Sequence, residues 1–178
     1  DQNMVVLVDV PDVPSTSFVT SINEGFVQAE KYRQALQRRS EVQSAGITIA
    51  TYGDDAFWDG GFPTEDGKQF NFRLNFVGGD YVKTLGLEMA KGRDLNPTPG
   101  SDIEPIILAK SPETIFSGIN MLMIHSATNP KVMVKGNGTD FETFRTLLEN
   151  EWEQVFPLET FSFSFLDETV QKQYVADE

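Results

Sequence analysis

The residues of this chain that could do chemistry are, first of all, carboxylates in its glycine- and proline-rich middle. Adjacent pairs occur at Asp54-Asp55 and Glu65-Asp66, with single carboxylates at Asp59, Asp102 and Glu104. Paired carboxylates can hold a metal ion or act as general acid and base. The first pair lacks the spacing of an EF-hand calcium loop, and Asp in such loops most often caps turns. We therefore expect turn-capping and solvent-facing roles here, and we predict no catalytic residue and no metal site.

The single histidine, His125, ends the apolar segment Met121-Leu122-Met123-Ile124. With one His and no Cys, the chain could hold a zinc ion only with additional carboxylate ligands. A Ser-His-Asp triad would lack the G-x-S-x-G turn that presents a nucleophilic Ser. Met121 and Met123 alternate along one strand, which is typical of packing rather than of a soft-metal surface. We expect His125 at a strand end or in the core, and an enzyme that combines it with loop carboxylates is a competing hypothesis.

Composition excludes several classes of partner and cofactor. Gly78-Gly79 and Gly136-Asn137-Gly138 match neither G-x-x-x-x-G-K-[ST] nor G-x-G-x-x-G, so we interpret both as turns and predict no cofactor. The 14 basic and 27 acidic residues give a net charge of −13. This charge disfavours nucleic acid and anionic lipid surfaces as partners. The absence of Cys excludes a disulfide framework.

Size and apolar content predict one compact body. The chain has 178 residues, an apolar fraction of 39% and 14 Phe, which is ample material for one hydrophobic core. No apolar run approaches the roughly 20 residues needed to span a bilayer. Because the sequence starts at Asp1 with neither an initiator Met nor a signal-like segment, we expect it to be a piece of a longer protein.

Hydrophobic periodicity predicts a β-α-β unit near the N-terminus. Residues 4–8 form an apolar, β-branched run that suits a buried strand. A helix is expected over residues 21–38, whose apolar side chains recur every three or four positions: Ile22, Phe26, Ala29, Tyr32 and Leu36. Its opposite face carries the charged and polar residues Glu30, Lys31, Arg33, Gln34 and Arg38. A second strand is expected over residues 42–52, with Ile47 and Ile49 alternating against Thr48 and Ala50.

A second β-α-β unit is predicted near the C-terminus. Residues 131–135 alternate as a short strand, and a glycine turn follows. Thr139-Asp140-Phe141-Glu142 has the S/T-x-x-E pattern of a capping box, which predicts a helix that starts at Thr139 and stops at Pro157. One face of this helix carries Phe141, Phe144, Leu148, Trp152 and Val155. The alternation of Phe161, Phe163 and Phe165 with Ser162 and Ser164 then predicts a strand with one buried face.

These units predict an α+β fold. Two β-α-β units commonly share one antiparallel sheet with both helices on one face, the ferredoxin-like arrangement. We assign residues 1–52 and 119–178 to this sheet. Residues 53–118, rich in Gly, Pro, Asp and Asn with short candidate strands at 69–76 and 106–108, are expected to form an inserted, loop-rich lobe. In this lobe Phe57, Trp58 and Phe62 form an aromatic group that could be its small core or a contact surface.

The stretch from Phe76 to Leu95, FVGGDYVKTLGLEMAKGRDL, resembles the MacB-like periplasmic core domain of FtsX-type ABC-transporter permeases. In that family a strand leads into an acidic-aromatic helix start, a Leu-Gly-Leu segment and a Gly-Arg-Asp turn. Residues 131–134, 139–157 and 161–168 look like the part that precedes the second transmembrane helix, and residues 3–9 look like the part that follows the first. The sequence departs from the family after Ile106-Ile107-Leu108, where it passes almost directly to Met121 without the usual Gly-Val-Val strand.

The resemblance implies a domain on the periplasmic side of the bacterial inner membrane, held between two transmembrane helices outside this sequence. It implies a porter-like β-α-β pair, a sabre-like inserted lobe and no active site. The implied partners are a cytoplasmic ATP-binding subunit, a second permease copy and a periplasmic protein. It also implies that Asp1 and Glu178 lie on one side of the fold. The alternative is a stand-alone periplasmic module that binds a ligand or protein through the Phe57-Trp58 loop.

Overall fold

A computed structural model describes residues 4–13, 18–51, 58–89 and 130–167. Within these ranges, side chains are described except at residues 18–19, 58–60 and 70–74. The elements follow in the order β1 (Val5–Asp9), α1 (Phe18–Gln37), β2 (Val42–Thr48), β3 (Trp58–Pro63), β4 (Gln69–Leu74), β5 (Val77–Gly79), α2 (Tyr81–Thr84), β6 (Lys131–Gly136), α3 (Phe141–Val155) and β7 (Phe163–Phe165).

The main sheet has five strands in the order β5-β2-β6-β1-β7, and every neighbouring pair is antiparallel. Strand β6 lies between β1 and β2, and β1 lies between β6 and β7, so each β-α-β unit is split by a strand of the other. This interleaving confirms the predicted α+β class and the two β-α-β units. It is compatible with a ferredoxin-like arrangement, with β5 added at the edge beside β2.

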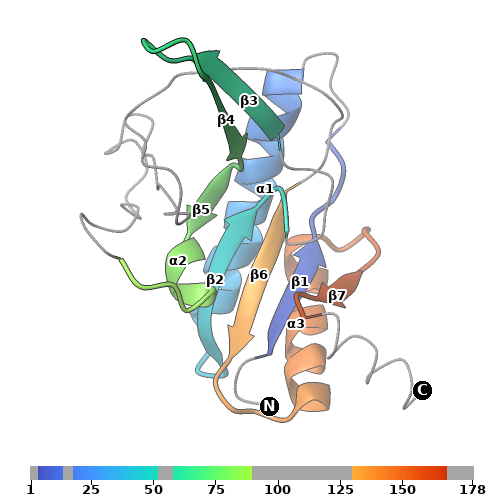
Figure 1. Cartoon of the computed structure of the whole chain (residues 1–178). Coiled ribbons are helices and arrows are strands. Elements are labelled where there is room, and N and C mark those ends of the chain that lie inside the picture. Colours follow the sequence, from blue (N-terminus) through green and yellow to red (C-terminus); the bar gives the residue numbers. More distant parts are fainter. Residues whose placement is uncertain (1–3, 14–17, 52–57, 90–129, 168–178) are drawn as a thin grey trace.

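The main core lies between this sheet and the helices α1 and α3, which both lie behind the sheet in Figure 1. Alternate residues of the three central strands point to this side, because successive side chains of a strand face opposite ways. The core residues from the sheet are Val6, Val8, Ala45, Ile47, Val132, Val134 and Phe165, and those from the helices are Ala29, Tyr32, Leu36, Phe144, Leu148 and Trp152. The predicted apolar faces of both helices are therefore confirmed at their central positions.

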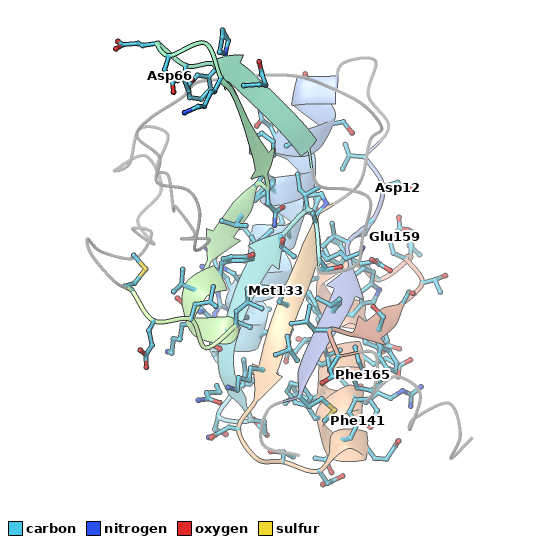
Figure 2. The ribbon with its side chains drawn as sticks, viewed as in Figure 1. Asp12, Asp66, Met133, Phe141, Glu159 and Phe165 are labelled. Atoms are coloured by element: carbon cyan, nitrogen blue, oxygen red, sulfur yellow. The ribbon has the colours of Figure 1, made fainter. Side chains whose placement is uncertain are left out.

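The other face of the sheet holds a smaller apolar cluster. Val5, Leu7 and Met133 are buried there, and the partly buried Tyr81, Leu85 and Leu166 pack against them. Figure 2 labels Met133 in the middle of this face. The short helix α2 therefore lies on the side opposite to α1 and α3, and apolar residues of the central strands are buried on both sides.

Strands β3 and β4 form a separate two-stranded sheet, a hairpin that projects from the end of the main sheet (Figure 1). Its turn is closed by the Thr64 amide, which donates to the Lys68 carbonyl at 2.8 Å, and by the Gly67 amide, which donates to the Thr64 carbonyl at 2.9 Å. The predicted strand at residues 69–76 is thus β4, paired with a strand that the periodicity did not reveal.

Three sequence expectations need correction. The N-cap of α3 is Asp140 rather than Thr139, because the Asp140 carboxylate accepts the Thr143 amide at 3.0 Å. Arg33 lies in the interior rather than on the solvent face, because β5 and the chain that follows it cover it. Helix α1 also ends at Gln37, so Arg38, which was expected on its polar face, follows its last residue.

Part of the expected inserted lobe belongs spatially to the main sheet. Within residues 53–118, β5 pairs with β2 and α2 packs against β2 and β6. Other expectations fall outside the described residues: the strand at 106–108, the segment from Met121 to His125, and the relative positions of Asp1 and Glu178. The boundaries of the lobe therefore stay a prediction.

Candidate functional site

Of the carboxylates singled out in the sequence, Asp66 is the one whose contacts are clearest. It accepts a hydrogen bond from the Thr64 hydroxyl and pairs with the Lys68 ammonium at 2.8 Å. The Lys68 ammonium, with help from the Thr64 hydroxyl, holds the pKa of Asp66 below its usual value. Figure 2 shows Asp66 at the far end of the hairpin. Its role is to order the turn, as the sequence predicted.

The other candidates that the structure describes do not come together in a site. Asp59 lies on β3 opposite Arg73, several residues away from the turn that holds Glu65 and Asp66. Asp54, Asp55, Asp102, Glu104, Met121, Met123 and His125 lie outside the described residues. Among the residues that are described, no three His, Asp or Glu side chains converge on a position that could hold a metal ion.

The segment that carries the family resemblance is held tightly against the sheet. A Cβ on Gly46 of β2 would lie 2.8 Å from the Tyr81 Cα, so only glycine lets α2 approach this closely. The Asp80 amide donates to the Ala45 carbonyl at 3.2 Å. At the other end of α2, the Thr84 hydroxyl donates to the Ser44 hydroxyl at 3.1 Å in a buried contact. Both ends of this short helix are thus fixed to β2.

A buried arginine determines the geometry just before α2. Arg33 of α1 is 5% exposed, and its Nε and Nη2 atoms donate to the two Glu30 carboxylate oxygens at 2.7 Å each. Gly79 has φ +59°, and a Cβ there would lie 2.5 Å from the Arg33 Cδ. The next residue, Asp80, accepts from the Gln37 side-chain amide at 2.9 Å. The Gly79-Asp80 pair therefore serves to fit the chain around Arg33.

The charged forms of Arg33 and Glu30 stabilise each other. Burial opposes ionisation of Glu30, but hydrogen bonds from Arg33 and Gln34 outweigh it and hold the pKa of Glu30 below its usual value. The Glu30 hydrogen bonds likewise raise the pKa of Arg33, against the opposing effect of burial. Both groups are charged at neutral pH, so the contact is a salt bridge with two parallel hydrogen bonds.

The chain enters and leaves the main sheet at adjacent points. The Leu166 amide donates to the Val5 carbonyl at 3.0 Å, and the register pairs Val6 with Phe165. A hollow of about 560 Å³ lies beside this contact, lined by Val5, Thr84, Leu85, Gly86, Lys135, Leu166 and Asp167. Two exposed apolar side chains follow α2, Leu87 at 54% and Met89 at 39%. We take this hollow, with the α2 segment that borders it, as the candidate functional site.

A second hollow lies at the opposite end of the sheet. Its volume is about 380 Å³, and the residues that line it include Asp9, Asp12, Glu159 and Lys131. Asp12 and Glu159 lie near each other in Figure 2. Glu159 also accepts the Trp152 indole N–H through its backbone carbonyl, at 3.0 Å. Among the described residues that line either hollow, no three His, Asp or Glu side chains form a group that could hold a metal ion.

Besides Arg33, sequence reasoning missed a second buried charge, Glu151. Glu151 lies among the apolar residues of α3 and is buried, with its carboxylate bound to the Arg39 guanidinium at the end of α1. The Tyr32 hydroxyl donates to the Leu148 carbonyl at 2.7 Å nearby, and burial, together with the charge of Glu151, raises the pKa of Tyr32. A signal existed: Glu151 lies three residues after Leu148 and next to Trp152 on the predicted buried stripe.

Comparison with known proteins does not assign a family. No protein-family model, curated protein or solved structure matches this chain. No helix among the described residues has both the length and the apolar content needed to cross a membrane. The local geometry and the sequence resemblance are therefore the basis on which a function can be proposed.

Proposed function

We propose that this chain is the extracytoplasmic domain of an ABC-transporter permease subunit of the FtsX/MacB-like group, located on the periplasmic side of a bacterial inner membrane. In this proposal the main sheet is a ferredoxin-like, porter-like unit, and part of residues 53–118 forms a sabre-like lobe. The domain is not an enzyme. It transmits conformational change driven by ATP hydrolysis in a cytoplasmic subunit to a periplasmic substrate or partner.

The observation that carries the proposal is the hydrogen bond between Val5 and Leu166. A domain inserted between two transmembrane helices must receive and return the chain near one membrane surface. The Leu166 amide lies 3.0 Å from the Val5 carbonyl, so the first and last strands of the sheet meet the remaining chain at the same place. Because β1 and β7 are antiparallel neighbours, a force applied along both connections acts on one edge of the sheet.

The position of the β3–β4 hairpin supports an orientation in which the Val5–Leu166 end of the sheet faces the membrane. It follows the end of β2, where Thr48 is opposite Lys131, and Lys131 is opposite Asp9. Val5 lies at the other end of the same ladder, opposite Lys135. The hairpin therefore projects from the end of the sheet farther from the Val5–Leu166 contact (Figure 1). In the proposed orientation it points away from the membrane, toward a periplasmic partner.

The proposal is tested by labelling in the full-length protein with its other cysteines replaced. Leu158 is 96% exposed, so Leu158→Cys should react with a membrane-impermeant maleimide in spheroplasts, and the protein should sediment with the membrane fraction. The matched control is Ala45→Cys, which is fully buried and should stay unlabelled until the protein is denatured. The expected partner, an ATP-binding subunit, should copurify in detergent. Labelling of Leu158→Cys only after lysis, or recovery of the protein in the soluble fraction, would refute the proposal.

One observation favours the alternative of a ligand- or protein-binding module. The hairpin register pairs Trp58 with Leu74 and Phe62 with Phe70, and the pair of Asp59 with Arg73 lies between them along the ladder. A two-stranded sheet whose sequence repeats apolar residue types at alternate positions suits contact with an apolar surface.

This alternative is tested by tryptophan fluorescence in a Trp152→Phe background, which leaves Trp58 as the single emitter. A ligand or partner that binds the hairpin should shift or quench this emission. Binding that is unchanged in Trp58→Ala would place the contact elsewhere and would count against the hairpin as a binding surface.

A further inference from the structure

The β3–β4 hairpin depends on its base for its orientation. It forms a two-stranded sheet of its own, and among the described helices and strands none packs extensively against it. An isolated two-stranded hairpin is at best marginally stable in water, and nothing in its own ladder sets its angle to a neighbouring sheet. Within the described part of the chain, the contacts that fix its direction are those where it joins the main sheet.

One side chain makes most of the polar contacts at that junction. Asn75, the residue after β4, accepts the Ala50 amide on Oδ1 at 2.9 Å. Its Nδ2 donates to the Thr48 hydroxyl at 2.8 Å and to the Ala50 carbonyl at 3.0 Å. The Thr48 hydroxyl in turn donates to the Ala50 carbonyl at 2.6 Å. Next to this network, the Ile49 amide donates to the Phe76 carbonyl at 3.1 Å.

The chemistry of these contacts requires an amide side chain. Strand β2 ends at Thr48, so the Ala50 amide and carbonyl lie beyond its ladder while Ala50 itself is buried. Buried backbone groups need hydrogen-bond partners, and an Asn side chain offers an acceptor and two donors in one planar group. Asn75 also partly offsets the rise in the pKa of the nearby Tyr81 that burial causes. A single side chain thus connects the hairpin base to the end of β2.

We propose that Asn75 is a clamp that fixes the direction in which the β3–β4 hairpin projects from the main sheet. It is a positioning residue, and the pivot that it locks lies between β4 and β5. With the clamp closed, the hairpin moves as a rigid extension of β2. With the clamp open, the hairpin turns about residues 75–76 while the main sheet stays folded. This inference does not depend on the proposed transport function.

The clamp can be tested by distance measurement, because the chain contains no Cys that would compete for labels. Spin labels at Glu65→Cys in the hairpin turn and Lys31→Cys on α1, both exposed, report the orientation of the hairpin by pulsed electron paramagnetic resonance. A second pair, Lys31→Cys with Glu153→Cys on α3, reports the main body. In the unaltered background both distance distributions should be narrow.

Asn75→Ala should broaden the hairpin distribution and leave the body distribution unchanged. Asn75→Asp should act in the same way, because it keeps the acceptor for the Ala50 amide but turns a second oxygen toward the Ala50 carbonyl. Asn23→Ala, on the exposed side of α1, is the matched control and should change neither distribution.

A hairpin distribution that stays narrow in both Asn75 variants, with the body intact, overturns the clamp. If Asn75→Ala also broadens the body distribution, Thr48→Val is measured instead, because it removes the hydroxyl partner of Asn75 and keeps the shape of the side chain. A hairpin distribution that stays narrow in Thr48→Val, with the body distribution unchanged, then overturns the clamp.

Discussion

Replacing Gly79 with alanine gives the sharpest check on how the α2 segment is held. Gly79 has φ +59°, a conformation that costs an L-residue about 1–2 kcal/mol. The new Cβ would also lie 2.5 Å from the Arg33 Cδ and 2.7 Å from its Nε. Arg33 must then move and weaken its paired hydrogen bonds to Glu30, at a further cost of about 1–2 kcal/mol. We expect Gly79→Ala to lower the free energy of unfolding by about 2–4 kcal/mol.

The measurement is urea unfolding of the purified domain followed by circular dichroism. For an m-value of about 2 kcal/mol/M, the expected loss shifts the midpoint by about 1–2 M. The matched control is Gly86→Ala: Gly86 has φ +67°, but no atom lies within 4 Å of its added Cβ, so it should lose only the backbone term of about 1–2 kcal/mol.

A double variant separates the steric cost of the new Cβ from the backbone cost. In the double variant Gly79→Ala/Arg33→Ala the clash is relieved, so its destabilisation should be smaller than the sum of the two single changes. Equal costs for Gly79→Ala and Gly86→Ala, or full additivity in the double variant, would refute the close contact between Gly79 and Arg33.

Three further predictions concern the two long helices. Leu148→Ala should lower the free energy of unfolding by about 2–5 kcal/mol in the same urea assay, because the side chain is 1% exposed; a loss below about 1 kcal/mol would contradict its core position. Tyr32→Phe should cost about 1 kcal/mol through its hydrogen bond to the Leu148 carbonyl. Since burial raises the pKa of Tyr32, unaltered protein should be stable below the ordinary tyrosine pKa and lose stability as pH rises above it, and Tyr32→Phe should lose less. Asp140→Ala should lower the thermal midpoint more than Thr139→Ala. The hydrogen bond from the Thr143 amide holds the pKa of Asp140 below its usual value. The difference between the two variants should therefore be present above the usual aspartate pKa and should vanish as pH falls through the lowered pKa. Equal thermal midpoints would restore Thr139 as the cap.

Long periodic segments were predictable because their signal is local. The helical spacing of Ala29, Tyr32 and Leu36 and the strand alternation around Val132 and Val134 each place one apolar face on a core. The end of α3 before Pro157 was equally local, because proline cannot continue a helix. The cap of α3 was missed by one residue, since Thr139 and Asp140 both suit an N-cap and only the hydrogen bond to Thr143 distinguishes them.

Short and charged segments were not predictable in the same way. Strand β5 has three residues, two of them glycine, so it carries no periodic signal and belongs to the sheet only through pairing with β2. Arg33 and Glu151 are charged residues of types that usually lie on the surface. Each can be buried because it forms an ion pair with an oppositely charged side chain. The family resemblance, with the transport function that it implies, stays a prediction.

The candidate site and the contacts around it have some properties that follow from the sequence and others that only the tertiary structure decides. By itself, the sequence determined that the chain has no Cys and no phosphate-binding motif, and that two β-α-β units carry the core. It also determined that glycines interrupt the stretch from Gly79 onward. Tertiary structure alone decided that Gly79 packs against Arg33, that Asn75 joins the hairpin to β2, and that Val5 and Leu166 meet. The physical reason is that hydrophobic periodicity acts within one element, whereas these three contacts join residues far apart in the chain. Contacts of that kind form only after the sheet has brought its strands together.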